Sequence, residues 1–550
     1  MIDSFTTHYD DMLTGSYDCV DRIVLNAYFP LGHNPAGFRY WWRKLNGNDD
    51  NLDDTHLIRM AGRFSRKLIA FAKSRDIPII HCGADTRKHL LAEEYLAKNP
   101  GTKGLFIIIV AKAPVSLWEV KRFARGGMDI RKKRSKSFVN HYHFHIIDPE
   151  WGHITFKLSG HPPFPVQVML NGHEYAECLL KKNELAFTKE GNCFTQIEQS
   201  SGLALVADAL RLENAIGRLS QVCDRWLYSV CLCCALTLEE QERSGFRYQY
   251  SVYQIEYSRN LLFRRGLQMD QVFEGMLDRT RSRIDIARIK TILGLKHRPY
   301  SRRSSRRKPP QFEVLLEKPV YGLTVFKVHF GRMTLKGYTK GERVLRFEVI
   351  VHNVRELKRG CVLERFTDII AYLQAALETF LNSLDKIDRA FISDEEWENL
   401  PSPSQVGKSH VGGVDVNKSR MRAVMRSVLT LSLAPRGFSS SSIAAEVRRL
   451  TGLEPEVYRA SHAAYDLRKL RGKNLVHREG SSRRYNASPQ GLQNMAATLA
   501  LREDVMKPVL AGISRMEQAS QVASTIPLDV CYANVRNGMK NLLAELGFAA

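Results

Sequence analysis

The segment comprising residues 461–489 restricts the fold of this chain more than any other stretch. Ala464, Leu467 and Leu470 recur at helical spacing, so one face of the helix predicted here is apolar. Gly472 is placed to end that helix. The other face is strongly basic, with Arg468, Lys469, Arg471 and Lys473. The pattern predicts a helix that packs one face on a core and offers the other face to a polyanion.

Two short predicted strands follow this helix, at residues 475–479 and 483–487, and a Gly-Ser-Ser turn joins them. Arg483 and Arg484 lie at the tip of the hairpin. A basic helix of this kind fits the major groove of duplex DNA, and a basic hairpin beside it reaches the neighbouring phosphates.

The flanking segments complete an ordered set of elements. Residues 421–433 and 443–450 are predicted as two helices, and residues 489–501 as a closing helix. This order resembles the winged helix-turn-helix superfamily, over about the last quarter of the chain. The resemblance implies DNA binding, and the final helices are similar to those that carry homodimer contacts in regulators of that superfamily. A winged helix used for protein contacts is the alternative.

The charge of the whole chain agrees with a polyanionic partner. Lys and Arg number 81 against 58 Asp and Glu, which gives a net charge of +23. Nucleic acid is the default partner for such a charge, and a basic surface without a specific partner is the alternative. The whole chain also resembles a widespread bacterial group present in several copies per genome, which implies a link to a mobile element.

The predicted fold class is a multidomain combination of α/β and α+β. A chain of 550 residues should hold about three or four domains. Buried strands alternate with helices near the N-terminus, which indicates parallel pairing. The predicted parts are an α/β domain at 1–118, a basic linker at 119–139, a central α+β domain of mixed sheet and helices at 140–400 with a basic insert at 296–310, a flexible linker at 401–417, and the winged-helix domain with C-terminal helices at 418–550.

Two basic segments are predicted to bind phosphate groups. Residues 121–136 hold eight basic residues against one Asp, and residues 296–308 hold seven Lys and Arg with no acid. Their candidate contacts to nucleic acid are Arg131, Lys132, Lys133, Arg134, Arg302, Arg303, Arg306, Arg307 and Lys308. Solvated linkers are the alternative. The aromatic residues within 38–43 either stack on unpaired bases or pack a helix into a core.

Residues 140–147 predict a strand that places histidines on one face. The pair His143 and His145, separated by one apolar residue, resembles the metal-binding pattern of the HUH endonucleases. That resemblance implies a divalent ion, Mg²⁺ or Mn²⁺, that polarises a DNA phosphate for attack by a tyrosine. His173 and Glu174 follow a predicted turn and are candidates for a third ligand. An antiparallel strand with a polar face is the alternative.

Residues 247–265 supply the candidate nucleophiles. Tyr253 and Tyr257 are four residues apart and are therefore neighbours on one face if this segment is a helix. Their spacing resembles the paired nucleophiles of rolling-circle replication initiators, with Tyr257 or Tyr253 attacking the phosphate. Tyrosines that pack at a wet helix interface are the alternative.

Residues 320–352 predict a strand meander with a second resemblance to replication initiators. A Tyr-x-Lys turn at Tyr338 precedes an Arg-x-Glu strand at Arg346 and Glu348, which implies that Glu348 assists at a metal. Thr339 departs from the family, which often has Asp after the tyrosine. A same-face ion pair between Arg346 and Glu348 is the alternative.

The remaining signals restrict location and cofactors. The first twenty residues carry four Asp, which is wrong for a secretory leader, and no apolar run is long enough for a membrane span. The ten cysteines form no CxxC pair, which favours reduced thiols in the cytoplasm. No Walker-type or dinucleotide-binding loop indicates a nucleotide cofactor.

These observations leave three hypotheses about function. The chain is either a metal-dependent nickase or strand transferase of a mobile element, a winged-helix DNA-binding regulator without catalysis, or an RNA-binding protein.

Overall fold

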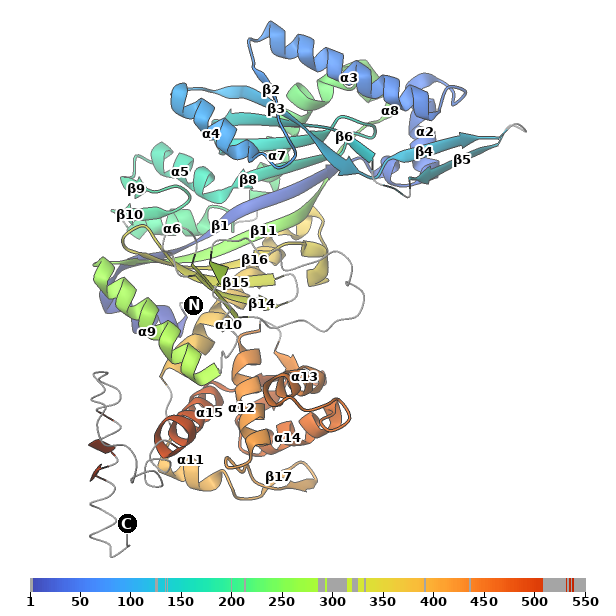
Figure 1. Ribbon diagram of the computed structural model, residues 1–550. Helices are drawn as coiled ribbons and strands as arrows, with labels where there is room; N and C mark the ends of the chain where they lie inside the picture. The colour runs from blue at the N-terminus through green and yellow to red at the C-terminus, as the bar shows by residue number, and fades with distance from the viewer. Residues whose placement is uncertain are drawn as a thin grey trace, which may run out of the picture. The chain divides into compact units, whose positions relative to one another are not determined.

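The computed structural model describes residues 3–123, 127–133, 135, 137–198, 200–211, 214–284, 292–293, 314–318, 325–330, 333–389, 392–434, 437–507, 531, 534–535 and 537–538. The chain divides into two compact units. Unit 1 comprises residues 1–12, 265–330 and 375–550, and unit 2 comprises residues 13–264 and 331–374. Both units are therefore assembled from segments that are distant in sequence (Figure 1).

Unit 2 is built on one large sheet. Its strand order is β15 (Met333–Lys340), β16 (Val344–Val351), β11 (Gln249–Phe263), β1 (Leu13–Tyr28), β8 (Val166–Asn171), β7 (Gly152–Ser159), β6 (Ser137–Asp148), β3 (Gly104–Val115) and β2 (Ile79–His81). The β2–β3 pair is parallel, and the other neighbours within unit 2 are antiparallel. The class is thus mixed α/β, as predicted.

The predicted boundary after residue 118 does not separate domains. β1 pairs with β8 and β11, and β3 pairs with β6, so the first 118 residues share a sheet with later segments. Short-range patterns cannot show such pairings, because strand partners distant in sequence leave no local trace. The predicted parallel pairing applies only to β2 and β3.

Helices cover the sheet of unit 2. They are α2 (Pro35–Asn46), α3 (Asp54–Ser74), α4 (Lys88–Lys98), α5 (Gly172–Lys182), α6 (Ser200–Asp208), α7 (Asn214–Trp226) and α8 (Leu238–Ser244). α4 packs on Ile107 and Ile109 of β3, and α5 and α6 pack against β1 (Figure 1). Three aromatic residues of α2, Phe38, Trp41 and Trp42, are buried and pack the helix into the core, whereas Tyr40 is exposed.

Three smaller features belong to unit 2. The predicted basic linker folds largely as a hairpin, β4 (Trp118–Arg122) and β5 (Met128–Lys132). The first residue of β4, Trp118, anchors the hairpin: it is buried, and its indole nitrogen donates a hydrogen bond to the carbonyl of Gly32 at 3.0 Å. A second hairpin comprises β9 (Phe187–Lys189) and β10 (Phe194–Ile197).

The helix predicted around Tyr253 and Tyr257 is wrong, because both residues lie in strand β11. β11 pairs along its length with β1 and along much of it with β16. Valine, isoleucine and tyrosine are common in paired strands, and the tyrosine spacing of four gave no way to distinguish the two structures. Tyr253 and Tyr257 are therefore not helical neighbours, and the pairing of β11 with β1 is irregular beside Tyr253, between Val252 and Gln254.

Unit 1 contains α1 (Ser4–His8), α9 (Gly266–Ile284), β12 (Ile292–Leu293), β13 (Val314–Lys318), β14 (Val325–Phe330), α11 (Asp394–Asn399), α12 (Ser419–Ser432), α13 (Ser440–Thr451), α14 (Ala460–Gly472) and α15 (Pro489–Ala500). The helix α10 (Phe366–Asp388) begins in unit 2 and continues in unit 1. A small sheet has the order β19 (Phe438–Ser439), β21 (Arg484–Ala487), β20 (Val476–Arg478).

The helices and the hairpin predicted between residues 421 and 501 are confirmed as elements. α12 packs on α13 and α15, and α13 packs on α14 (Figure 1). Part of the predicted flexible linker is an ordered hairpin, β17 (Ser404–Val406) and β18 (Ser409–Val411), because Val411 and Val414 are buried.

Several predictions lie outside the described residues. They concern Arg134, the basic insert with Arg302, Arg303, Arg306, Arg307 and Lys308, and most of the C-terminal segment to which homodimer contacts were assigned. Across the described part of the chain, no helix combines the length and the apolar character that crossing a membrane requires.

Candidate functional site

The helix α14 presents a polar and basic face to solvent. Its buried side consists of Ala463, Leu467 and Leu470, together with the carboxylate of Asp466. The exposed residues on its other side are Ser461, His462, Tyr465 and Arg468. Arg468 has no ion pair or hydrogen bond within the described part of the chain, so its charge is available to a ligand.

The other basic residues predicted on α14 are less exposed. Lys469 is half-buried, and its ammonium lies 5.2 Å from the ring centre of Tyr465. Arg471 and Lys473 are also half-buried, and burial lowers the pKa of Lys473. The hairpin β17–β18 packs against this end of α14, and of the four predicted basic residues only Arg468 is fully exposed.

The hairpin β20–β21, which follows α14 in the sequence, carries exposed arginines. Arg483 and Arg484 are both exposed. The guanidinium of Arg484 donates a hydrogen bond to the carbonyl of Gly437 at 3.3 Å, so this residue also ties the hairpin to the start of α13. Gly480 has a φ of 52°, which suits a glycine in the tight turn.

Two basic residues at the hairpin β4–β5 are paired with carboxylates. Arg131 forms an ion pair with Glu119 at 2.8 Å, and Lys133 lies 3.3 Å from the carboxylate of Asp54. The ammonium of Lys132 lies 5.4 Å from the ring centre of Trp118. This hairpin therefore offers less unpaired charge than its sequence indicates.

The histidines predicted to bind a metal lie in β6, as expected, but they are buried. His145 is 2% exposed, and its Nδ1 lies 3.1 Å from Nε2 of His153 on the neighbouring strand. His143 lies opposite Lys157. Burial lowers the pKa of His143 and of His145 to about 3 and that of His153 to about 4, with nearby lysines and histidines adding to the first two shifts.

In the part of the chain that the structure describes, neither His173 nor Glu174, the candidates for a third ligand, joins His143 and His145 in a metal-binding group. Within the described residues, neither His143 nor His145 belongs to a group of three metal-ligating side chains with converging donor atoms. His173 lies in α5 and faces a different set of side chains. Lys157 lies opposite His143, and its charge adds to the lowering of the pKa of His143.

The predicted nucleophiles differ in exposure. Tyr257 is 1% exposed, and its hydroxyl donates a hydrogen bond to Asp18 at 2.8 Å. Burial and the neighbouring Asp18 raise the pKa of Tyr257 well above its usual value. Tyr253 is 36% exposed. The structure therefore does not bring Tyr257 and the histidines of β6 into one open site.

Arg346 and Glu348 form the same-face ion pair that was the alternative to a metal role. Nε of Arg346 lies 2.8 Å from Oε1 of Glu348, and the hydroxyl of Tyr338 donates to the same oxygen at 2.6 Å. Lys336 lies 3.5 Å from the other oxygen. Direct strand pairing produces this arrangement, because Tyr338 lies opposite Arg346 and Lys336 opposite Glu348.

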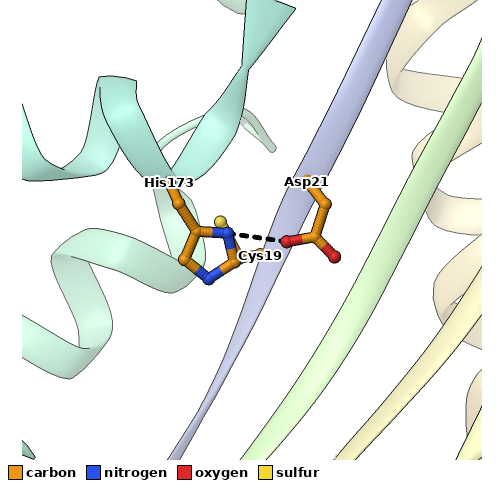
Figure 2. Close-up of side chains that lie close together, drawn as sticks. All are labelled: Cys19, Asp21 and His173. Carbon is orange, nitrogen blue, oxygen red and sulfur yellow. Dashed lines mark ion pairs between the residues drawn. The ribbon is translucent and has the colours of Figure 1, made fainter. Parts of the chain in front are cut away.

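The ion pair extends to Asp21 and His173, which sequence reasoning did not connect. Nη2 of Arg346 lies 2.5 Å from Oδ2 of Asp21, and Nδ1 of His173 lies 2.6 Å from Oδ1. Burial alone would raise the pKa of Asp21, but Arg346 and His173 hold it down, at about 2. The thiol of Cys19 lies beside both groups (Figure 2).

These residues come from separate segments of the chain. Cys19 and Asp21 lie in β1, His173 at the start of α5, and Arg346 in β16. One signal was present in the sequence: Asp21 lies next to the apolar run that begins at Ile23, where an unpaired carboxylate would be costly if buried. Its partners could not be predicted, because they lie about 150 and 325 residues away along the chain.

In comparisons with known proteins, no family model, no curated protein and no solved structure matches the chain.

Proposed function

We propose that this protein binds duplex DNA through residues 419–500, with α14 in the major groove and the hairpin β20–β21 against the sugar-phosphate backbone. The observation that carries the proposal is the pair of exposed arginines, Arg468 on α14 and Arg483 on the hairpin, which have no acidic partner within the described residues. Unpaired basic side chains on a helix and an adjacent hairpin suit base edges and phosphates, respectively.

The order of elements supports the same reading. Two helices, α12 and α13, precede α14, and a small three-stranded sheet joins the hairpin to the start of α13. This arrangement resembles a winged helix-turn-helix, in which the third helix enters the groove and the hairpin forms the wing. The net charge of +23 adds a long-range attraction to any polyanion.

Direct binding measurements test the proposal. Fluorescence anisotropy of labelled duplex DNA, single-stranded DNA and an RNA hairpin is measured against the full chain at several salt concentrations. We expect the tightest binding to duplex, with an affinity that falls steeply as salt rises. Preference for the RNA hairpin would support the RNA-binding hypothesis and contradict the proposal.

A matched pair of variants separates a specific surface from net charge. The variant Arg468→Gln/Arg483→Gln removes two charges from the proposed surface, and Arg87→Gln/Lys103→Gln removes two exposed charges from unit 2. We expect Arg468→Gln/Arg483→Gln to lose about 1–3 kcal/mol of binding free energy for the base contact of Arg468, and to lose the phosphate contact of Arg483 as well. Arg87→Gln/Lys103→Gln should bind nearly as tightly as the unmodified chain. Equal loss in both variants would contradict a binding surface on α14.

The hypothesis of metal-dependent nicking has no geometric support of this kind and stays a prediction. The same DNA samples, incubated with Mg²⁺ or Mn²⁺ and separated on a denaturing gel, test for cleavage or a covalent protein-DNA adduct.

A further inference from the structure

Three metal-ligating side chains converge inside unit 2. The donor atoms of Cys19, Asp21 and His173 all lie within 4.8 Å of one another, and the residues are at most 3% exposed (Figure 2). We propose that these three residues bind one divalent transition-metal ion of the zinc type, a site separate from the predicted His143 and His145 pair.

Local structure holds the three donors in place. Cys19 and Asp21 are two residues apart in β1, and Asp21 lies within a register shift between Val20 and Ile23, so the strand is irregular where it carries the carboxylate. The side chain of Asn171 accepts a hydrogen bond from the backbone nitrogen of His173 at 2.8 Å, which caps α5 and sets the position of the imidazole.

Gly172 fixes the distance between α5 and β1. A Cβ atom at this position would lie 1.7 Å from the carbonyl oxygen of Val20, so only glycine permits this approach. The close contact brings His173, the next residue, over the strand that carries Cys19 and Asp21. The backbone therefore delivers the imidazole to these two donors.

The contact between Asp21 and His173 leaves a polar atom of each side chain without a well-formed hydrogen bond. Oδ1 of Asp21 and Nδ1 of His173 lie 2.6 Å apart, yet within the described residues neither atom has a hydrogen-bond partner of acceptable geometry. Buried polar atoms in proteins are nearly always satisfied, so two such atoms facing each other need an explanation. A cation bound by both supplies one.

The surrounding side chains suit an outer shell. The hydroxyl of Tyr17 lies 3.3 Å from Nε2 of His173, so an imidazole that binds metal through Nδ1 can donate its other N–H to this oxygen. Arg346 contacts Oδ2 of Asp21, the oxygen that does not face His173. Arg346 thus orients the carboxylate and leaves Oδ1 for the ion.

The donor set selects the type of metal. A thiolate, an imidazole and a carboxylate together are typical of Zn²⁺, whereas Mg²⁺ and Mn²⁺ prefer oxygen ligands throughout. Zinc is usually four-coordinate, so three protein donors leave one position, which full burial restricts to a water molecule or another small ligand. The ion would hold α5 on β1.

Metal analysis of the purified full chain tests the proposal. The protein is expressed with added zinc, washed with a weak chelator and analysed for metal per chain. We expect about one zinc ion per chain, and a loss of roughly tenfold or more in zinc affinity for each of Cys19→Ser, Asp21→Asn and His173→Gln. Cys223→Ser is the matched control, because Cys223 is equally buried but lies in α7, outside the cluster. It should retain the metal.

Cobalt substitution of the unmodified chain covers the case in which variants do not fold. Co²⁺ bound by a thiolate in a tetrahedral site gives visible absorption bands and a sulfur-to-cobalt charge-transfer band. Added zinc should displace the cobalt, and these bands should then disappear. The proposal is overturned if the unmodified chain holds no stoichiometric zinc and shows no such bands, or if the three variants fold and keep the metal as Cys223→Ser does.

Discussion

Arg346 and Asp21 form an ion pair that is closed to solvent: Nη2 and Oδ2 lie 2.5 Å apart, and the two side chains are 0% and 1% exposed. Arg346 also contacts Glu348, so one guanidinium balances two buried carboxylates. Breaking a buried pair leaves uncompensated charge, which costs far more than the pair itself contributes.

We therefore predict that Arg346→Met lowers the free energy of unfolding by about 3–5 kcal/mol, because Asp21 and Glu348 lose their shared counter-charge. Urea unfolding at neutral pH measures the change. Arg365→Met is the control, since Arg365 pairs with Asp368 on the surface, where both side chains are more than half exposed. If Arg346→Met lowers the free energy of unfolding as little as Arg365→Met does, the ion pairs of Arg346 with Asp21 and Glu348 do not stabilise the fold.

Acid should destabilise the protein through the buried histidines of β6 and β7. The pKa of His145 is about 3 in the folded chain and about 6.5 when unfolded, so between these values the unfolded state binds more protons. The stabilisation from neutral His145 is therefore complete above pH 6.5 and is lost as pH falls toward 3, by about 2 kcal/mol at pH 5.

The comparison of His145→Gln with the unmodified chain at pH 7 and pH 5 tests this. The variant should show the smaller decrease in unfolding free energy between the two pH values. The exposed His410 supplies the control His410→Gln, which should follow the unmodified chain. An unchanged decrease in His145→Gln would exclude His145 as a source of the acid sensitivity.

Tyr257→Phe should affect stability rather than any chemistry on DNA. The substitution removes a buried hydrogen bond to Asp18, which also accepts from Arg259 at 2.7 Å, and should cost about 1–3 kcal/mol of unfolding free energy. If a covalent DNA adduct forms, we expect Tyr253→Phe, not Tyr257→Phe, to reduce it, because Tyr253 is the exposed tyrosine. Loss of an adduct in a folded Tyr257→Phe chain would contradict this.

Single substitutions at Arg468 and Arg483 should have different effects on DNA binding. Arg483→Gln removes a proposed phosphate contact, so it should weaken all duplexes alike and reduce the slope of log affinity against log salt by about 0.9. Arg468→Gln should instead reduce the preference for a selected sequence, by about 1–3 kcal/mol. Salt titrations with selected and scrambled duplexes measure both quantities, and identical profiles would refute the division of roles.

The hairpin β4–β5 should contribute little to DNA affinity despite its basic sequence. Arg131 and Lys133 are already paired with Glu119 and Asp54, and binding a phosphate would require breaking those contacts. Arg131→Gln should therefore change duplex affinity by less than Arg483→Gln does in the same titration. If Arg131→Gln loses more duplex affinity than Arg483→Gln, the exposed ion pair between Arg131 and Glu119 opens on binding, because such surface pairs are weak.

Local sequence patterns predicted the elements of residues 419–500 because each helix and strand there carries its own periodicity and punctuation. Leu467 and Leu470 mark the buried side of α14, and Gly480 marks the hairpin turn. The strand with His143 and His145 was likewise predicted from alternation. The error at Tyr253 and Tyr257 arose where tyrosines at a spacing of four fit either structure.

By itself the sequence determined the positively charged character of the chain, most of its elements, and the order of helices and hairpin in residues 419–500. Tertiary structure alone decided which charges meet. Asp21, His173 and Arg346 are distant along the chain and become neighbours only because β11 joins β1 to β16 in the sheet and α5 packs on β1 through Gly172. Side-chain convergence of this kind depends on strand register and helix approach, which no local pattern encodes.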